Sequence, residues 1–85
     1  MEHKFHMQKA AEILQRLQDS EIGVLMLATP NKGWTWSIKS PFADKVASES
    51  TTPVADFMEA VCSMAFQAQK AFPGSNFAKW YLEQE

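Results

Sequence analysis

The chain has two histidines near its start, His3 and His6, spaced so that a helix would place them one turn apart. Two imidazoles at that spacing can share a metal ion, but a zinc site needs three or four ligands. No nearby Cys, Asp or Glu completes the set, and Glu2 is only a helical neighbour of His6. We interpret the pair as terminal side chains that titrate near neutral pH, and we predict no metal and no cofactor.

The single cysteine, Cys62, falls in the middle of a predicted helix, on its apolar side. A nucleophilic cysteine needs a helix N-terminus or a cationic neighbour to lower its pKa. Cys62 has neither in the sequence, so we expect a buried, inert thiol. The acidic residues are scattered, and no two of them form a recognisable acid and base. With three glycines, the chain also lacks a glycine-rich phosphate loop. We therefore predict that it is not an enzyme.

Two tryptophans, Trp34 and Trp36, lie two residues apart directly after a turn signal. Stacking a base on an aromatic ring is worth about 1–3 kcal/mol, and Lys32 and Lys39 are close enough in sequence to contact a nucleic-acid backbone. One hypothesis is therefore a single-stranded nucleic-acid (RNA) binding protein that uses these four residues. The other places both rings in the core beside Ile38. We favour the core, because the helices need an apolar sheet face to cover.

Size and composition indicate one globular domain spanning residues 1–85. Hydrophobic residues make up 46% of the chain and aromatic residues 12%, which excludes a disordered chain. A net charge of −2 argues against a protein whose affinity comes from neutralising phosphates. One cysteine permits no intramolecular disulfide and fits a reducing cytoplasm. Neither a signal peptide nor a membrane span is recognisable, so we expect a cytoplasmic location and no membrane partner.

Three helices follow from periodicity and capping residues. Residues 2–20 carry an apolar stripe at helical spacing. A second helix is predicted from Thr52 as N-cap, with Pro53 in its first turn. Its apolar residues span about half the circumference, so it must be covered on more than one side and is expected to be central. Ser75 is predicted to cap a last helix.

A β-hairpin is predicted between the first two helices. Residues 22–29 are a short apolar run, which favours a strand buried on both faces. Residues 30–33 supply turn chemistry, and residues 34–39 alternate with period two. Residues 40–52 are rich in Ser and Thr, and Pro41 blocks a continuing strand. A short helical turn and an irregular third strand both stay open for this segment.

The expected fold is a small single α+β domain of order α-β-β-α-α, in which the hairpin packs against the central apolar helix. Two strands alone make a weak sheet, and a strand that is apolar on both faces needs neighbours. The sequence therefore also predicts a symmetric homodimer that joins hairpins edge to edge or packs them face to face.

The small size, mild acidity, single cysteine and lack of catalytic motifs resemble the general profile of small accessory proteins of phages and mobile elements, such as host-defence inhibitors, and of bacterial immunity proteins. This resemblance is one of composition. It implies a non-enzymatic inhibitor or modulator that occludes a protein target. The residues expected to be presented to that target are Asp56 and Glu59 on the central helix and Phe42 and Lys45 in the preceding segment.

Overall fold

The computed structural model describes the backbone of residues 2–40 and 46–84, and the side chains from residue 8 onward within those ranges. The described residues form a mixed α+β fold with three helices and a three-stranded antiparallel sheet, which confirms the predicted fold class. The elements are α1 (Glu2–Asp19), β1 (Gly23–Thr29), β2 (Gly33–Lys39), β3 (Val46–Glu49), α2 (Phe57–Ala71) and α3 (Asn76–Glu83).

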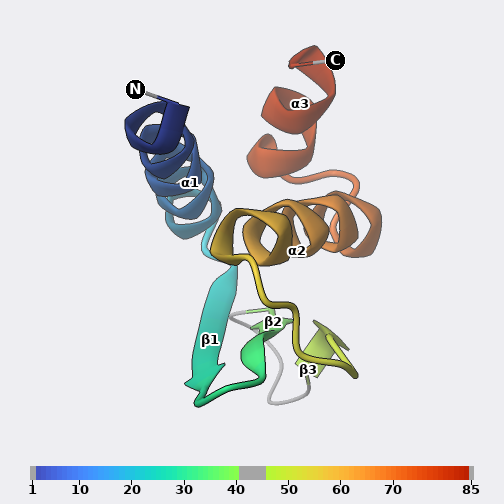
Figure 1. The fold of residues 1–85 in the computed structure, drawn as a ribbon. Helices are drawn as coiled ribbons and strands as arrows, with labels where there is room; N and C mark the ends of the chain where they lie inside the picture. Colours follow the sequence, from blue (N-terminus) through green and yellow to red (C-terminus); the bar gives the residue numbers. More distant parts are fainter. Residues whose placement is uncertain (1, 41–45, 85) are drawn as a thin grey trace.

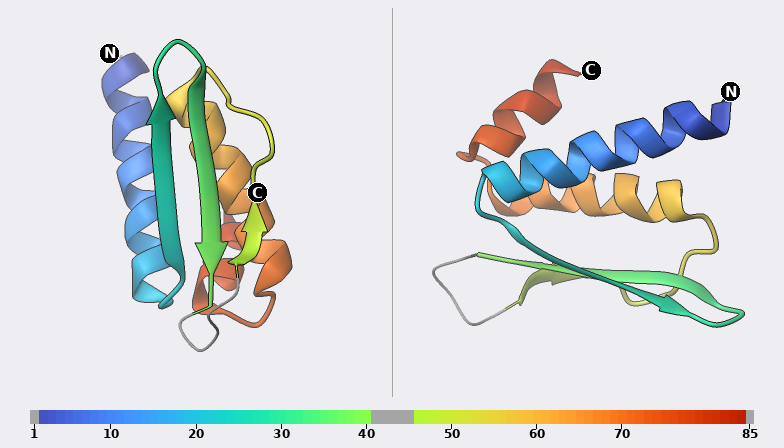
Figure 2. Two further views of the ribbon diagram at one scale, coloured as in Figure 1. Left: turned by 90° about the horizontal axis from the view of Figure 1, so that it is seen from below. Right: turned by 90° about the vertical axis from the view of Figure 1, so that its left-hand side faces the viewer.

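The elements are stacked with α2 in the middle (Figure 1). The sheet lies against one side of α2, and α1 and α3 lie on the other (Figure 2). Contacts with all of these neighbours explain why α2 is apolar around so much of its surface. The predicted central position of this helix is confirmed. The core consists of residues at most 6% exposed, among them Leu17, Trp36, Ile38, Val61, Met64 and Phe77.

The junction between α1 and β1 is fixed by backbone hydrogen bonds. Glu21 has φ 60°, the left-handed conformation that ends many helices. Its N–H donates to the carbonyl of Gln18 at 2.9 Å, and the N–H of Ile22 donates to the carbonyl of Leu17 at 3.0 Å. Ile22 and Leu17 are both buried beside this turn. This Schellman-type ending sets the direction in which β1 leaves the helix, and α1 and β1 diverge from it (Figure 2).

The predicted hairpin is present, with β1 and β2 paired through seven consecutive residues from Gly23↔Lys39 to Thr29↔Gly33. Its turn places Pro30 before Asn31, which has φ 63°. That is the sequence pattern of a type II turn, and the N–H of Lys32 closes it by donating to the carbonyl of Thr29 at 3.0 Å.

A third strand, β3, corrects the five-element order to α-β-β-β-α-α. Of the two conformations left open for this segment, the irregular strand is confirmed. Ser50 pairs with Trp36, donating its N–H to the Trp36 carbonyl at 2.9 Å and accepting the Trp36 N–H on Oγ at 2.8 Å. The ladder shifts register between Ile38 and Lys39. At the other end of β2, an isolated bridge joins Trp34 to Val54. The N–H of Trp34 donates to the carbonyl of Val54 at 2.7 Å, and the Val54 N–H donates to the Trp34 carbonyl at 2.9 Å.

The prediction that residues 22–29 are buried on both faces is wrong. Leu25 and Leu27 are each 55% exposed. The sheet order is β1-β2-β3, so β1 is an edge strand, and the helices cover only one face of the sheet. An unbroken apolar run does not distinguish these two environments.

The predicted start of the second helix is also wrong. The helix begins at Phe57, and the Asp56 carboxylate caps it by accepting the N–H of Glu59 at 3.0 Å. Thr52 and Pro53 precede it, because the backbone of Val54 is held by Trp34 in the sheet. The predicted cap of α3 is confirmed, since Ser75 Oγ accepts the N–H of Ala78 at 3.1 Å.

Candidate functional site

The side chains of the sheet alternate between a covered face and an open one. Trp34, Trp36 and Ile38 of β2 point toward the helices, and their partners on β1 (Val24, Met26 and Ala28) share that side. The intervening residues lie on the face turned away from the helices. We call this the outer sheet face, and its exposed apolar members are Leu25, Leu27 and Val46.

Leu25 and Leu27 are the centre of the outer sheet face. They are neighbours on the same side of β1, and their cross-strand partners on β2 are Ser37 and Thr35, which carry hydroxyl groups but no charge. Val46, 48% exposed, lies at the opposite edge of the same face. Contiguous exposed apolar side chains rimmed by polar groups are typical of an interaction site.

The free edge of β1 can be identified from the hydrogen bonds of β2. Successive residues of an antiparallel strand direct their backbone groups to opposite neighbours. Trp34 and Trp36 bond toward the β3 side, so the odd-numbered residues of β2 bond to β1. Their partners in β1 are also odd-numbered. The even-numbered residues of β1 therefore direct their N–H and C=O groups away from the sheet. These residues are Val24, Met26 and Ala28, and we call them the β1 edge.

The β1 edge lacks the features that normally keep sheet edges from pairing, which are charge, proline, bulges and short length. Its sequence, GVLMLAT, contains no charged residue and no proline, and its seven residues pair in one unbroken register with β2. The opposite edge differs in charge, length and regularity. β3 has four residues, includes Glu49, and is irregular at the Ile38/Lys39 step. Of the two edges that the described residues form, the β1 edge is thus the one suited to accept another strand.

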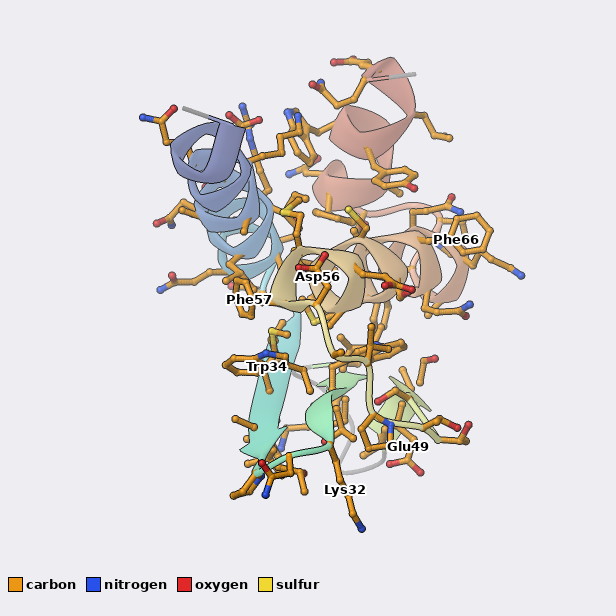
Figure 3. All side chains as sticks on the ribbon, in the orientation of Figure 1. Lys32, Trp34, Glu49, Asp56, Phe57 and Phe66 are labelled. Carbon is orange, nitrogen blue, oxygen red and sulfur yellow. The ribbon has the colours of Figure 1, made fainter. Side chains whose placement is uncertain are left out.

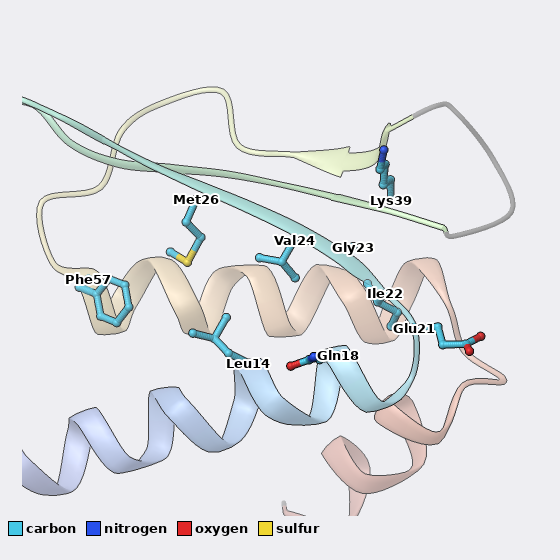
Figure 4. A pocket seen from close by; sticks show the side chains of 9 residues that line it. All are labelled: Leu14, Gln18, Glu21, Ile22, Gly23, Val24, Met26, Lys39 and Phe57. Carbon is cyan, nitrogen blue, oxygen red and sulfur yellow. The ribbon is translucent and has the colours of Figure 1, made fainter.

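A groove of about 870 Å³ runs beside the β1 edge, on the helix side of the sheet (Figure 4). Leu14 of α1, Val24 and Met26 of β1 and Phe57 of α2 give it an apolar lining. Glu21 lies at its other end, where Lys39 borders it from the outer sheet face. The groove exists because α1 diverges from β1 and leaves the inner side of the edge strand incompletely covered.

The tryptophans are part of the core, as the favoured hypothesis predicted. Trp36 is 6% exposed, and its Nε1 finds no acceptor among the described residues, so packing alone holds the ring. Trp34 is half-buried against Phe57. Lys39 lies on the outer sheet face, where its side chain runs across Gly23, and Lys32 is in the hairpin turn. The structure therefore does not bring the two rings and the two lysines onto one surface.

Asp56 and Glu59 are both exposed at the N-terminus of α2. Asp56 has a structural role as the helix cap, and it lies on the helix side of the sheet rather than on the outer sheet face (Figure 3). Phe42 and Lys45, also predicted to contact a partner, lie outside the described residues. The exposed apolar residues of the outer sheet face are thus not among the residues predicted to contact a target.

The prediction of a buried cysteine is wrong, because Cys62 is exposed. It borders a pocket of about 140 Å³ between α1, α2 and α3. Trp80 forms another side of this pocket, with Lys9 Nζ 5.3 Å and the Arg16 guanidinium 5.1 Å from its ring centroid. These cations connect α1 to α3 across α2. Cys62 is exposed beside this pocket, which the helical periodicity of α2 alone could not reveal.

Among residues with described side chains, no three or more His, Cys, Asp and Glu are grouped to hold a metal ion. The side chains of His3 and His6 lie outside that part. None of the helices, over their described lengths, has the apolar span needed to cross a membrane. Comparison with known proteins finds no matching family model, and no match among curated proteins or solved structures.

The sequence predicted that a hairpin edge is left free, but it did not predict that β1 supplies this edge or that Leu25 and Leu27 are exposed on the outer sheet face. The sequence does contain a signal for a pairing edge, because a run of seven uncharged residues without proline is unusual for an edge strand. It could be recognised only once the strand order was known. In a central strand the same run would mean ordinary burial.

Proposed function

We propose that this chain is a non-catalytic binding protein that recognises a protein target through its outer sheet face and acts as an inhibitor or modulator by occluding that target. The observation that carries the proposal is the pair Leu25 and Leu27, adjacent on one strand and each 55% exposed on an uncharged part of the face. Burying apolar surface gains roughly 25 cal/mol per Å², so covering this pair favours association.

The chemistry of the surface favours a protein target over nucleic acid. The chain has a net charge of −2, and phosphate contacts dominate nucleic-acid affinity. Trp36, half of the predicted stacking platform, is buried under α2. The hydroxyl groups of Thr35 and Ser37 beside the leucines can hydrogen-bond a protein rim. Nucleic-acid binding through Trp34, Trp36, Lys32 and Lys39 would require the sheet to separate from the helices.

Site-specific photo-crosslinking in the native host tests the proposal. A photoreactive phenylalanine analogue replaces Leu25 in one variant and Phe66 in a control. Phe66 is an apolar side chain of similar exposure, 46%, on α2. We expect a defined protein adduct, resistant to nuclease, from position 25 only. Adding Leu27→Lys to the same variant should abolish that adduct.

Three results would contradict the proposal. The first is an identical adduct from position 66, and the second is an adduct that survives Leu27→Lys. The third is a signal that disappears after nuclease treatment, which would favour the nucleic-acid alternative. An adduct of the chain with a second copy of itself is recognised by its mass and scored separately.

A further inference from the structure

We infer that the β1 edge accepts an extended segment of the target protein as a fourth strand of the sheet. The segment runs antiparallel to β1, places alternate apolar side chains in the groove, and carries an acidic residue opposite Gly23. As a statement about the target, this inference rests on the proposed function, and it extends the contact from the outer sheet face to the adjoining edge. The ability of the edge to accept a strand is measured with a synthetic peptide.

The β1 edge offers backbone hydrogen bonds at every second residue. Val24, Met26 and Ala28 direct their N–H and C=O groups outward. In an antiparallel neighbour, the residue opposite each of them exchanges two hydrogen bonds with it, so the added strand forms about six. Antiparallel pairing is also slightly more stable per residue than parallel pairing. In recognition by strand addition, such main-chain bonds supply affinity, and pockets for alternate side chains supply specificity.

The groove receives the side chains on the helix side of the added strand. Residues opposite Val24 and Met26 direct their side chains to the same side of the sheet as these two, toward Leu14 of α1 (Figure 4). Helix α1 and β1 meet at the turn that contains Glu21 and diverge from there (Figure 2). The groove therefore deepens from Val24 toward Met26, where Phe57 lines it. A valine-sized side chain fits opposite Val24, and an aromatic ring fits opposite Met26.

The position of α1 favours an extended segment over a second folded copy of this chain. Helix α1 lies alongside the free edge of β1 on the helix side of the sheet (Figure 2). A second copy that paired its own β1 at this edge would bring its own α1 into the same space. An extended segment without a helix beside it leaves that space to its side chains. Helix α1 then covers the helix side of the added strand, so the apolar side chains in the groove are shielded from water.

Lys39 gives the added strand a charge requirement. Its cross-strand partner Gly23 has no side chain, so Lys39 reaches over Gly23, where a Cβ would lie 3.2 Å from Lys39 Cγ and 3.7 Å from Cε. Lys39 makes no ion pair with any described side chain. An acidic residue opposite Gly23 places its carboxylate on the outer sheet face, beside this lysine. Glu21 lies at the same end of the groove and would repel an acid on the helix side, so the outer position is the favourable one.

Titration of the isotope-labelled chain with a synthetic peptide, followed by NMR, tests the inference. The probe is acetyl-Val-Thr-Phe-Thr-Val-Glu-amide, in which Phe faces Met26 and Glu faces Gly23. We expect saturable binding with a Kd below about 1 mM and the largest shifts in the backbone amides of the β1 edge. N-methylation of the Phe removes an N–H that bonds to Met26 and should weaken binding roughly 10-fold or more. N-methylation of the Thr that follows it is the matched control, because that N–H points away from β1, and binding should be kept.

Substitutions in the chain test the edge and the acidic residue separately. Val24→Lys places an inward-pointing charge on the β1 edge, a feature that prevents edge pairing, and should weaken peptide binding roughly 10-fold or more. Val46→Lys is the matched control at the opposite edge of the sheet and should leave binding unchanged. Lys39→Glu should weaken binding of the probe about two- to fivefold at low salt, and this variant should prefer a peptide with Lys in place of Glu. The amide spectrum shows whether each variant is folded, and the N-methylated pair needs no variant.

An unchanged spectrum at about 5 mM peptide would overturn the inference, as would equal binding of the two N-methylated peptides or equal binding by the two Val→Lys variants. A Lys39→Glu variant that still prefers the acidic peptide would contradict the acidic residue opposite Gly23. If the peptide binds as described but no target adduct forms from position 25, the edge accepts a strand and the proposed function fails. If the adduct forms, Val24→Lys leaves it unchanged and the peptide does not bind, the proposed function stands and this inference fails.

Discussion

The ring of Phe57 stands edge-on to the indole of Trp34, with centroids 4.8 Å apart and ring planes inclined at 66°. This contact joins the first residue of α2 to the hairpin at the end where α1 has diverged from the sheet. It explains why Trp34 contributes to the core rather than forming a platform for ligands. It also closes one end of the groove beside the β1 edge.

Removing the Phe57 ring should destabilise the fold. Phe57→Ala loses both the apolar burial and the edge-to-face contact with Trp34, and we expect a loss of about 2 kcal/mol in the free energy of unfolding. Phe66→Ala removes the same side chain from an exposed position of the same helix and should cost under about 1 kcal/mol. Urea denaturation followed by tryptophan fluorescence measures both. Equal losses would contradict a structural role for the Trp34 contact.

Gly33 is the glycine that the fold requires most strictly. Its φ is 115°, and a Cβ there would collide with the carbonyl group of Val54 and the Cα of Ala55. Gly33→Ala should therefore cost at least about 2 kcal/mol, since strain and overlap act together. Gly74→Ala is the control, because a Cβ at that position meets nothing within 4 Å. It should be neutral or slightly stabilising. A Gly33→Ala variant as stable as the control, measured by thermal unfolding, would contradict this backbone geometry.

The two acidic residues at the start of α2 should differ in their effect on stability. Asp56→Ala removes the side chain that accepts the Glu59 N–H and should cost about 0.5–2 kcal/mol in unfolding free energy. Glu59→Ala removes an exposed side chain and keeps that N–H, so its cost should stay within about 0.5 kcal/mol. Chemical denaturation of the two variants decides between them. The result also determines which residue can be charge-reversed to test partner binding, because only a change at Glu59 leaves the helix cap intact.

Local chemistry predicted much of the fold. Ser75 caps α3 because a hydroxyl at that position satisfies a free N–H of the first turn, and Pro30 with Asn31 determines the turn. The same rule failed at Thr52, where the backbone of Val54 is held by Trp34. A capping residue competes with other partners of the backbone, and a partner twenty residues earlier is not visible in a local pattern. The choice between a helical turn and a third strand was left open for the same reason. The strand is held by hydrogen bonds between Ser50 and Trp36, which is distant in sequence.

The candidate site was less predictable than the fold. Asp56 and Glu59 were correctly expected to be exposed, but exposure of charged residues carries little information. The informative residues are Leu25 and Leu27, which were expected inside the protein. Their exposure follows from the position of β1 at the sheet edge and from helices on one face only. Strand order and layer order are properties of the whole chain, and periodicity within seven residues does not determine them.

Cys62 should react with thiol reagents in the native protein. It is exposed beside the pocket that Trp80 lines, so a disulfide reagent such as Ellman's reagent should modify it without denaturant, within a few-fold of its rate in urea. Met64→Cys in a Cys62→Ser background is the control, because Met64 is fully buried on the same helix. That thiol should react only as the protein unfolds, and at least 100-fold more slowly. If native Cys62 reacted as slowly as the control thiol, α1 and α3 would have to close over this part of α2. That result would contradict the exposed position of Cys62 in the structure.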